Sequence, residues 1–166
     1  MQLGRILMSG LELYTDIHVV ITLVAIFSGF VVLYGMIKAL AMPRWTQLFL
    51  VTTVLTSVTG FFFPFHGFTP ALGLGIVSMF LLAGALAALY LYRLGGAWRP
   101  VYVVCAVAAL YFNCFVLVVQ SFLKIPPLHG LAPTGSEPPF AAAQGLVLVF
   151  FLVTGYLAVK RFRPAA

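Results

Sequence analysis

Five apolar stretches, each long enough to cross a lipid bilayer as a helix, dominate this 166-residue sequence. A helix needs about 20 residues to cross the hydrocarbon core, where every backbone polar group must find a partner within the protein. With 63% hydrophobic and 7% charged residues, the chain is not an ordinary water-soluble domain, in which about a quarter of residues are charged. We therefore predict an all-helical, polytopic membrane protein with one domain over residues 1–166. The five transmembrane helices are expected at about 17–40, 45–65, 70–94, 98–125 and 139–162.

Turn-forming residues separate these stretches. Pro43 follows the first, Gly95 and Gly96 predict a tight turn after the third, and a longer loop at 126–138 carries four prolines. Glycine and proline favour turns and interrupt regular helices. The breaks therefore agree with five separate helices.

The charged residues divide unequally between the two sides of this predicted bundle. Seven of the nine Lys and Arg residues fall beside the first and third loops or at the C-terminal end, and only Arg5 and Lys124 fall on the other side. All three acids and all three histidines also fall on that other side. Cytoplasmic loops carry the excess of Lys and Arg, so we expect the N-terminus outside and the C-terminus inside. Single basic residues beside apolar helices indicate the lipid bilayer as partner, and not nucleic acid.

A narrow polar ridge runs along the fourth predicted helix. At 100° per residue, Tyr102, Asn113, Gln120 and Lys124 fall within an arc of about 40°. An amide turned toward lipid finds no hydrogen-bond partner, so this ridge is expected to face the interior of the bundle.

Polar residues of other segments are expected at a similar depth, near the outer leaflet. His18, Thr22, Ala25 and Gly29 share one face of the first helix, and Gln144 lies near the outer end of the fifth. These residues predict a polar pocket, but amides in membrane helices also serve simply to tie two helices together, for about 0.6–2 kcal/mol. Both interpretations stay open. The candidate ligand-binding residues are Asn113, Gln120, Gln144, His18, His66, Glu137 and Tyr102.

The three histidines leave cofactor binding open. Imidazole is a common ligand for zinc, copper and haem iron, which makes His18, His66 and His129 candidate metal ligands. None belongs to a His-x-x-x-His or Glu-x-x-His pair, so no metal site is assigned. His18 and His66 could serve as axial haem ligands from adjacent helices, and the phenylalanines around His66 could line a quinone pocket. The cofactor is therefore unknown.

The function expected from these residues is non-enzymatic. The sequence contains no nucleophile elbow, no nucleotide-binding loop and no pair of carboxylates within the membrane. We expect an accessory subunit of a larger membrane complex, or a protein that binds a small ligand in the outer pocket. A redox protein that uses His18 and His66 is one alternative. An oligomeric channel or carrier is another, although such proteins usually place an ionisable group within the membrane.

Four stretches of the sequence carry a resemblance to known proteins. They are 59–69 (TGFFFPFHGFT), 98–102 (WRPVY), 109–113 (ALYFN) and 131–140 (LAPTGSEPPF). With them, the chain from Trp45 onward resembles a group of small bacterial inner-membrane proteins of similar length, a group with no assigned activity. The resemblance implies a location in a bacterial cytoplasmic membrane and implies no functional residue.

Overall fold

The computed structural model describes residues 2–64 and 70–163, with side chains described for 10–64 and 72–163. These residues form helices joined by short connections and contain no strand, so the predicted all-helical fold is confirmed for them. The elements are α1 (Gln2–Ile37), α2 (Pro43–Gly60), α3 (Pro70–Leu86), the π-helical turn η1 (Ala87–Leu91), α4 (Trp98–Lys124), α5 (Pro126–Leu131) and α6 (Pro138–Arg161).

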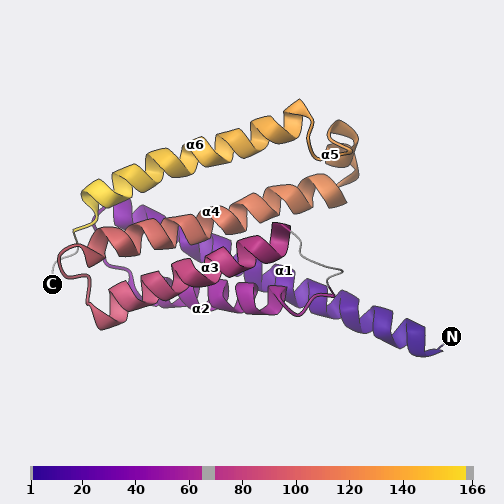
Figure 1. Ribbon diagram of the computed structural model, residues 1–166, viewed down its shortest axis with the longest axis horizontal. Helices are drawn as coiled ribbons and strands as arrows, with labels where there is room; N and C mark the ends of the chain where they lie inside the picture. Colours follow the sequence, from indigo (N-terminus) through magenta and orange to yellow (C-terminus); the bar gives the residue numbers. More distant parts are fainter. Residues whose placement is uncertain (1, 65–69, 164–166) are drawn as a thin grey trace.

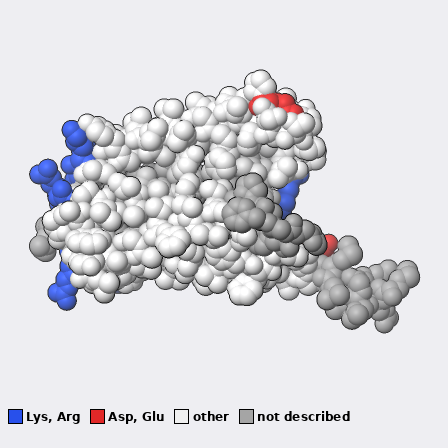
Figure 2. Space-filling view, viewed as in Figure 1, with Lys and Arg blue, Asp and Glu red and all other residues white. Residues whose placement is uncertain are grey.

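The five long helices lie side by side and alternate in direction (Figure 1). α4 is central, since it contacts α1, α2, α3, α5 and α6. The α1–α2 loop, the turn after η1 and residues 162–163 lie together at one end, which we call the basic end (Figure 1). The N-terminal half of α1, residues 61–64 and helix α5 lie at the opposite end. Figure 2 shows most of the Lys and Arg side chains at the basic end and the acidic side chains at the opposite end.

Four of the described helices are long and apolar enough to cross a membrane: Gly10–Ile37, Leu72–Leu91, Trp98–Lys124 and Pro138–Arg161. α2 is not among them by composition, because its 18 residues include Arg44 and Gln47 as well as six Thr and Ser residues. Several of these hydroxyls face inward and bond to the helix itself: Thr52 donates to Leu48 O at 2.6 Å, and Ser57 is buried. The molecule is therefore compatible with a multi-pass membrane protein of at least four spans.

The helix boundaries differ from the expected ones in three places. α1 begins near the N-terminus instead of at residue 17, and it ends at Ile37, because Ala39 adopts a left-handed conformation (φ 56°). α3 was expected to continue to residue 94, but Arg93 and Leu94 are also left-handed and stop it at η1. The predicted loop at 126–138 contains helix α5, which two prolines begin. Proline suits the first turn of a helix, where its missing N–H has no partner to lose.

The core is tightest where α1 crosses α2 and α4. Gly29 is buried there, and a Cβ atom added to it would lie 2.5 Å from Leu110 Cδ1 and 2.9 Å from the Phe49 ring. Ala25, one turn earlier on the same face, is fully buried. Small residues let membrane helices approach closely in this way. The predicted face of α1 is thus polar at His18 and Thr22, and it packs closely against α2 and α4 at Ala25 and Gly29, nearer the basic end.

Candidate functional site

A cavity of about 530 Å³ lies between α1, α2, α3 and α4 near the opposite end. We call it the amide cavity, because Asn113 and Gln120 of α4 both line it. Its other polar side chains come from all four helices, and its apolar surface includes Leu23, Leu117 and two phenylalanines that end α2. The remaining polar lining residues are Thr15, His18, Thr22, Thr56, Ser57, Ser78, Ser121 and Lys124.

Asn113 is the most constrained polar residue of this cavity. It is only 7% exposed, and its Nδ2 atom is buried without a hydrogen-bond partner among the described residues. Sixteen residues into a 27-residue helix, it lies about 22 Å from the start of α4 and about 16 Å from Lys124 at the end. A buried amide N–H without an acceptor is costly, about 1–3 kcal/mol in proteins. A group that accepts a hydrogen bond from Asn113 within the cavity would remove this cost.

Three other buried polar atoms lack a partner in the described residues, and they provide a comparison. They are Thr53 Oγ1, Gln144 Oε1 and Arg99 Nε. Thr53 and Gln144 line neither the amide cavity nor the cavity at the basic end, whereas Arg99 lines the latter. Of these four atoms of the described residues, the one that belongs to the lining of the amide cavity is therefore Asn113 Nδ2.

His18 closes the cavity at the contact between α1 and α2. Its Nδ1 atom lies 2.8 Å from Thr59 Oγ1, whose own hydrogen is donated to Leu55 O at 2.6 Å. When the Thr59 hydroxyl donates to Leu55 O, it accepts from His18 Nδ1; this arrangement corresponds to the tautomer with the proton on Nδ1 and the lone pair on Nε2. Nε2 has no hydrogen-bond partner in residues 10–64 and 72–163. His18 can thus offer an acceptor nitrogen to a ligand.

Aromatic contacts hold the same end of α2 in place. Phe63 packs edge-on against both Tyr14 (5.0 Å between ring centroids) and His18 (5.1 Å). The Tyr14 hydroxyl donates to Thr59 O at 2.6 Å. These contacts fix the His18 ring before any ligand arrives, as a binding site requires.

The structure brings His18, Asn113 and Gln120 together in the amide cavity, but it does not bring Tyr102, Gln144 or Glu137 there. Tyr102 shares a helical face with Asn113, yet eleven residues separate them by about 16 Å along α4, so Tyr102 lines a cavity at the basic end. Gln144 lies on α6, where its Nε2 donates to Phe115 O of α4 at 3.1 Å. Its role in this geometry is to tie two helices together, which was the other interpretation of the amides.

Glu137 serves the loop that precedes α6. Its carboxylate accepts from the Thr134 backbone N–H (3.0 Å), the Thr134 hydroxyl (2.9 Å) and the Ser136 backbone N–H (3.0 Å). These bonds, the one from the Thr134 backbone first, lower the pKa of the Glu137 carboxyl from 4.5 to about 2. The ionised group also stands at the positive end of α6. Glu137 therefore shapes the loop and the start of the helix.

The described residues give the histidines no shared site. His66 lies outside the described residues, and His129 is exposed on α5. No group of three His, Cys, Asp or Glu side chains in the described part of the chain is placed to hold a metal ion. A metal or haem site that depends on His66 stays a prediction.

Comparison with known protein families, with curated proteins and with solved structures gives no match to this chain. The function must be argued from the site itself.

Proposed function

We propose that the chain is a five-span protein of a bacterial inner membrane, with its N-terminus outside and its C-terminus in the cytoplasm. α2 supports the fifth crossing, because it lies between α1 and α3 in the bundle and its 18 residues are about 27 Å long. Its polar hydroxyls face protein, as a spanning helix requires. The basic end supports the orientation, since basic residues concentrate on the cytoplasmic side. The resemblance to small bacterial membrane proteins supports the location.

In this orientation the amide cavity opens toward the outer leaflet, and we infer that it binds a small amphipathic ligand. The observation that carries this inference is the buried Nδ2 atom of Asn113, which lines the cavity and lacks an acceptor among the described residues. Few buried polar groups in proteins stay unpaired, and those that do call for an explanation. A bound acceptor oxygen supplies one.

The lining defines the chemistry of this ligand. Asn113 is buried, and among the cavity's lining residues the one Lys or Arg is Lys124, about 16 Å away along α4, so an uncharged acceptor oxygen, as in a carbonyl, ester or hydroxyl group, suits Asn113 best. Nearer the helix end, Lys124 lines the cavity and is exposed, so it can pair with an anionic or strongly polar end of the ligand. The distance between the two is about 16 Å. A linear molecule with a polar end and an oxygen along its apolar part matches both requirements.

A quinone is one ligand of this class, and the aromatic lining favours it among redox cofactors. Its two carbonyl oxygens accept hydrogen bonds from groups such as Asn113, and Phe61 and Phe63 provide flat apolar surfaces beside His18. Binding of this kind needs no reaction at the site, so the protein would act as a binding protein or as the ligand-holding subunit of a larger complex.

The test is extraction of small molecules from the purified protein, followed by mass spectrometry and an ultraviolet–visible spectrum. We expect one class of oxygen-containing amphipathic molecule to be retained by the unmodified protein. Asn113→Leu should lower its recovery by about tenfold, because one buried hydrogen bond of about 1.4 kcal/mol is lost.

Gln144→Leu is the matched control, since it removes an amide of α6 that does not line the cavity. The amount of retained molecule recovered from Gln144→Leu should equal the amount recovered from the unmodified protein. Equal recovery from the Asn113 and Gln144 variants, or no retained molecule in the unmodified protein, would count against a ligand in this cavity. A quinone spectrum in the extract would identify the retained ligand as a quinone.

A further inference from the structure

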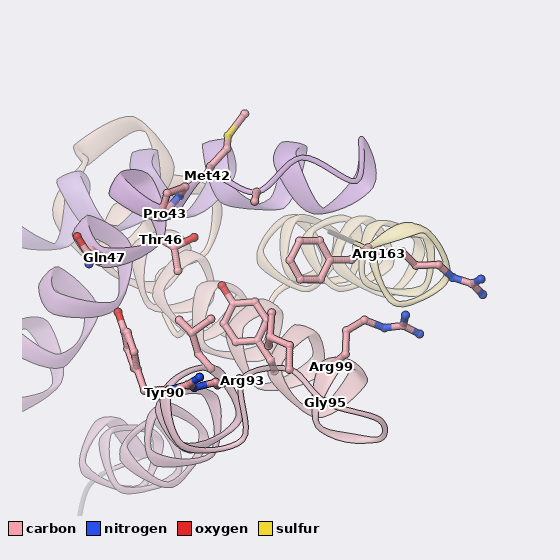
Figure 3. A pocket seen from close by; sticks show the side chains of 14 residues that line it. Met42, Pro43, Thr46, Gln47, Tyr90, Arg93, Gly95, Arg99 and Arg163 are labelled. Carbon is pink, nitrogen blue, oxygen red and sulfur yellow. The ribbon is translucent and has the colours of Figure 1, made fainter. Parts of the chain in front are cut away.

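We propose that a second cavity, at the basic end of the bundle, binds an anionic phosphate group. This arginine cavity has a volume of about 610 Å³ and is lined by Arg93, Arg99 and Arg163. The three side chains come from separate segments: the turn after η1, the first turn of α4 and the residues after α6. In Figure 3, Arg99 and Arg163 extend on the same side of the cavity, and Arg93 lies on the other side, near Tyr90.

The positive charge of this cavity has no side-chain counterpart nearby. The chain has three acids, Glu12, Asp16 and Glu137, and these belong to the opposite end of the bundle. Arg99 Nε is buried and has no hydrogen-bond acceptor in the described residues. A guanidinium group stays charged at any physiological pH, so it cannot escape this situation by losing a proton. An anion held between the arginines would satisfy both the charge and the buried N–H.

A ring contact closes the connection between η1 and α4. Tyr92 and Trp98 stack with their rings parallel and 3.7 Å apart, and each stands directly before an arginine, Arg93 in the turn or Arg99 in α4. Arg93 adopts a φ of 48°, a conformation that residues with a side chain rarely take. Such strain persists where the surrounding structure imposes it, and it concentrates at binding sites. Here it places Arg93 on the rim of the cavity.

The interior of the cavity is closely packed. Tyr102 of α4 and Thr46 of α2 both line it, and both are buried, Tyr102 to 1% exposure. The neighbouring Arg99 and Arg163 guanidinium groups suit phosphate in particular, because the planar guanidinium fork donates two parallel hydrogen bonds to two phosphate oxygens.

The phosphate could belong to an anionic phospholipid headgroup or to a soluble phosphate compound. The cavity geometry is the same for both sources and does not depend on the ligand of the amide cavity. Two probes separate them: phosphatidylglycerol, titrated into detergent micelles that hold the full chain, and inorganic phosphate, titrated in the same buffer. Diacylglycerol, which has the same tails and no phosphate, is the control lipid.

The measurement is the shift in melting temperature with each probe, together with native mass spectrometry to count bound lipid. We expect a saturable rise and one bound phosphatidylglycerol per chain, with no rise for diacylglycerol. If inorganic phosphate gives the same rise in melting temperature and displaces the lipid, the ligand is a soluble phosphate compound. If only phosphatidylglycerol raises the melting temperature, the ligand is a lipid headgroup. No shift with either phosphate probe would overturn the proposal.

Variants of matched charge test the arginines themselves. The double change Arg99→Gln with Arg163→Gln should raise the half-saturating concentration by about tenfold or more. Lys160→Gln with Arg161→Gln removes the same charge from the same end, but these residues do not line the cavity. This pair should change binding by about twofold at most, as expected for exposed charges. An equal loss in both double variants would overturn the proposal in favour of general attraction to the basic surface.

A third double change, Arg99→Lys with Arg163→Lys, keeps the charge and removes the guanidinium fork. It covers the case in which the glutamine variant does not fold. We expect it to fold and to weaken binding by about fivefold or more, because lysine donates as a point charge. Unchanged binding in the lysine variant would contradict phosphate recognition by the arginines.

Discussion

Gly29→Leu is expected to lower the free energy of unfolding by about 3 kcal/mol, at the upper end of the range for an overpacked core. Even a single Cβ at this position would lie 2.5 Å from Leu110 Cδ1 and 2.9 Å from two atoms of the Phe49 ring. Leu110 and Phe49 are both 1% exposed, so neither can move aside without disturbing α4 or α2. Three helices would have to separate to admit the new side chain.

The two free cysteines of the protein allow its unfolding to be measured. Cys114 is buried and Cys105 is partly buried, and both are free, so a thiol-reactive fluorescent dye follows unfolding during a temperature ramp in detergent. Gly145→Leu is the control, because nothing lies within 4 Å of a Cβ at that position on α6. We expect its melting curve to match that of the unmodified protein. A Gly29→Leu curve that also matched would show that α1, α2 and α4 do not pack as closely as described.

Asn113→Leu is expected to raise the stability of the ligand-free protein by about 1–3 kcal/mol. The change replaces a buried N–H that has no acceptor with an apolar group of similar size, and so removes a desolvation cost. The same change abolishes any stabilisation that a bound ligand gives through this amide. Residues that bind a ligand often lower the stability of the ligand-free protein in this way.

Gln144→Leu should have the opposite sign in the same assay. Its Nε2 bonds to Phe115 O across two helices, so its loss is expected to destabilise the bundle by about 0.6–2 kcal/mol. The direction of the change in stability therefore distinguishes the two roles: loss of an amide that ties helices together lowers stability, and loss of an unpaired amide in a binding cavity raises it. A fall in stability for Asn113→Leu in ligand-free protein would mean that Asn113 has a structural partner, and the amide cavity would lose its main support.

The helical fold could be predicted because long apolar runs and their breaks leave few options in a membrane. The predicted separation of charges is also present in the structure, where the loops at each end of the bundle lie together (Figure 1) and the acids lie opposite most of the basic residues (Figure 2). Helix α5 does not follow from the sequence pattern, because prolines such as Pro126 and Pro127 are typical of loops as well as of the first turn of a helix. The π-helical turn of η1 has no clear signal in its sequence, Ala87 to Leu91.

The candidate site was predicted only in part, and depth explains most of the difference. The angular positions of Tyr102 and Asn113 around the helix axis show that they share a face. They do not show that the two residues are about 16 Å apart along the axis, and this distance puts them in different cavities. The partner of Gln144 is a backbone carbonyl, which no side-chain pattern reveals. The arginine cavity was missed because Arg163 is far from Arg93 and Arg99 in the sequence and meets them only through the packing of α6 against α4.

The central claim is that the chain crosses the membrane five times with the basic end in the cytoplasm, and reporter fusions test it most directly. Alkaline phosphatase, which is active only outside the cytoplasm, is fused after residue 42, after residue 64 and after residue 163. Five crossings predict activity after residue 64 and none after residues 42 and 163. If α2 did not cross, the fusions after 42 and 64 would behave alike; activity after residue 163 would contradict the orientation.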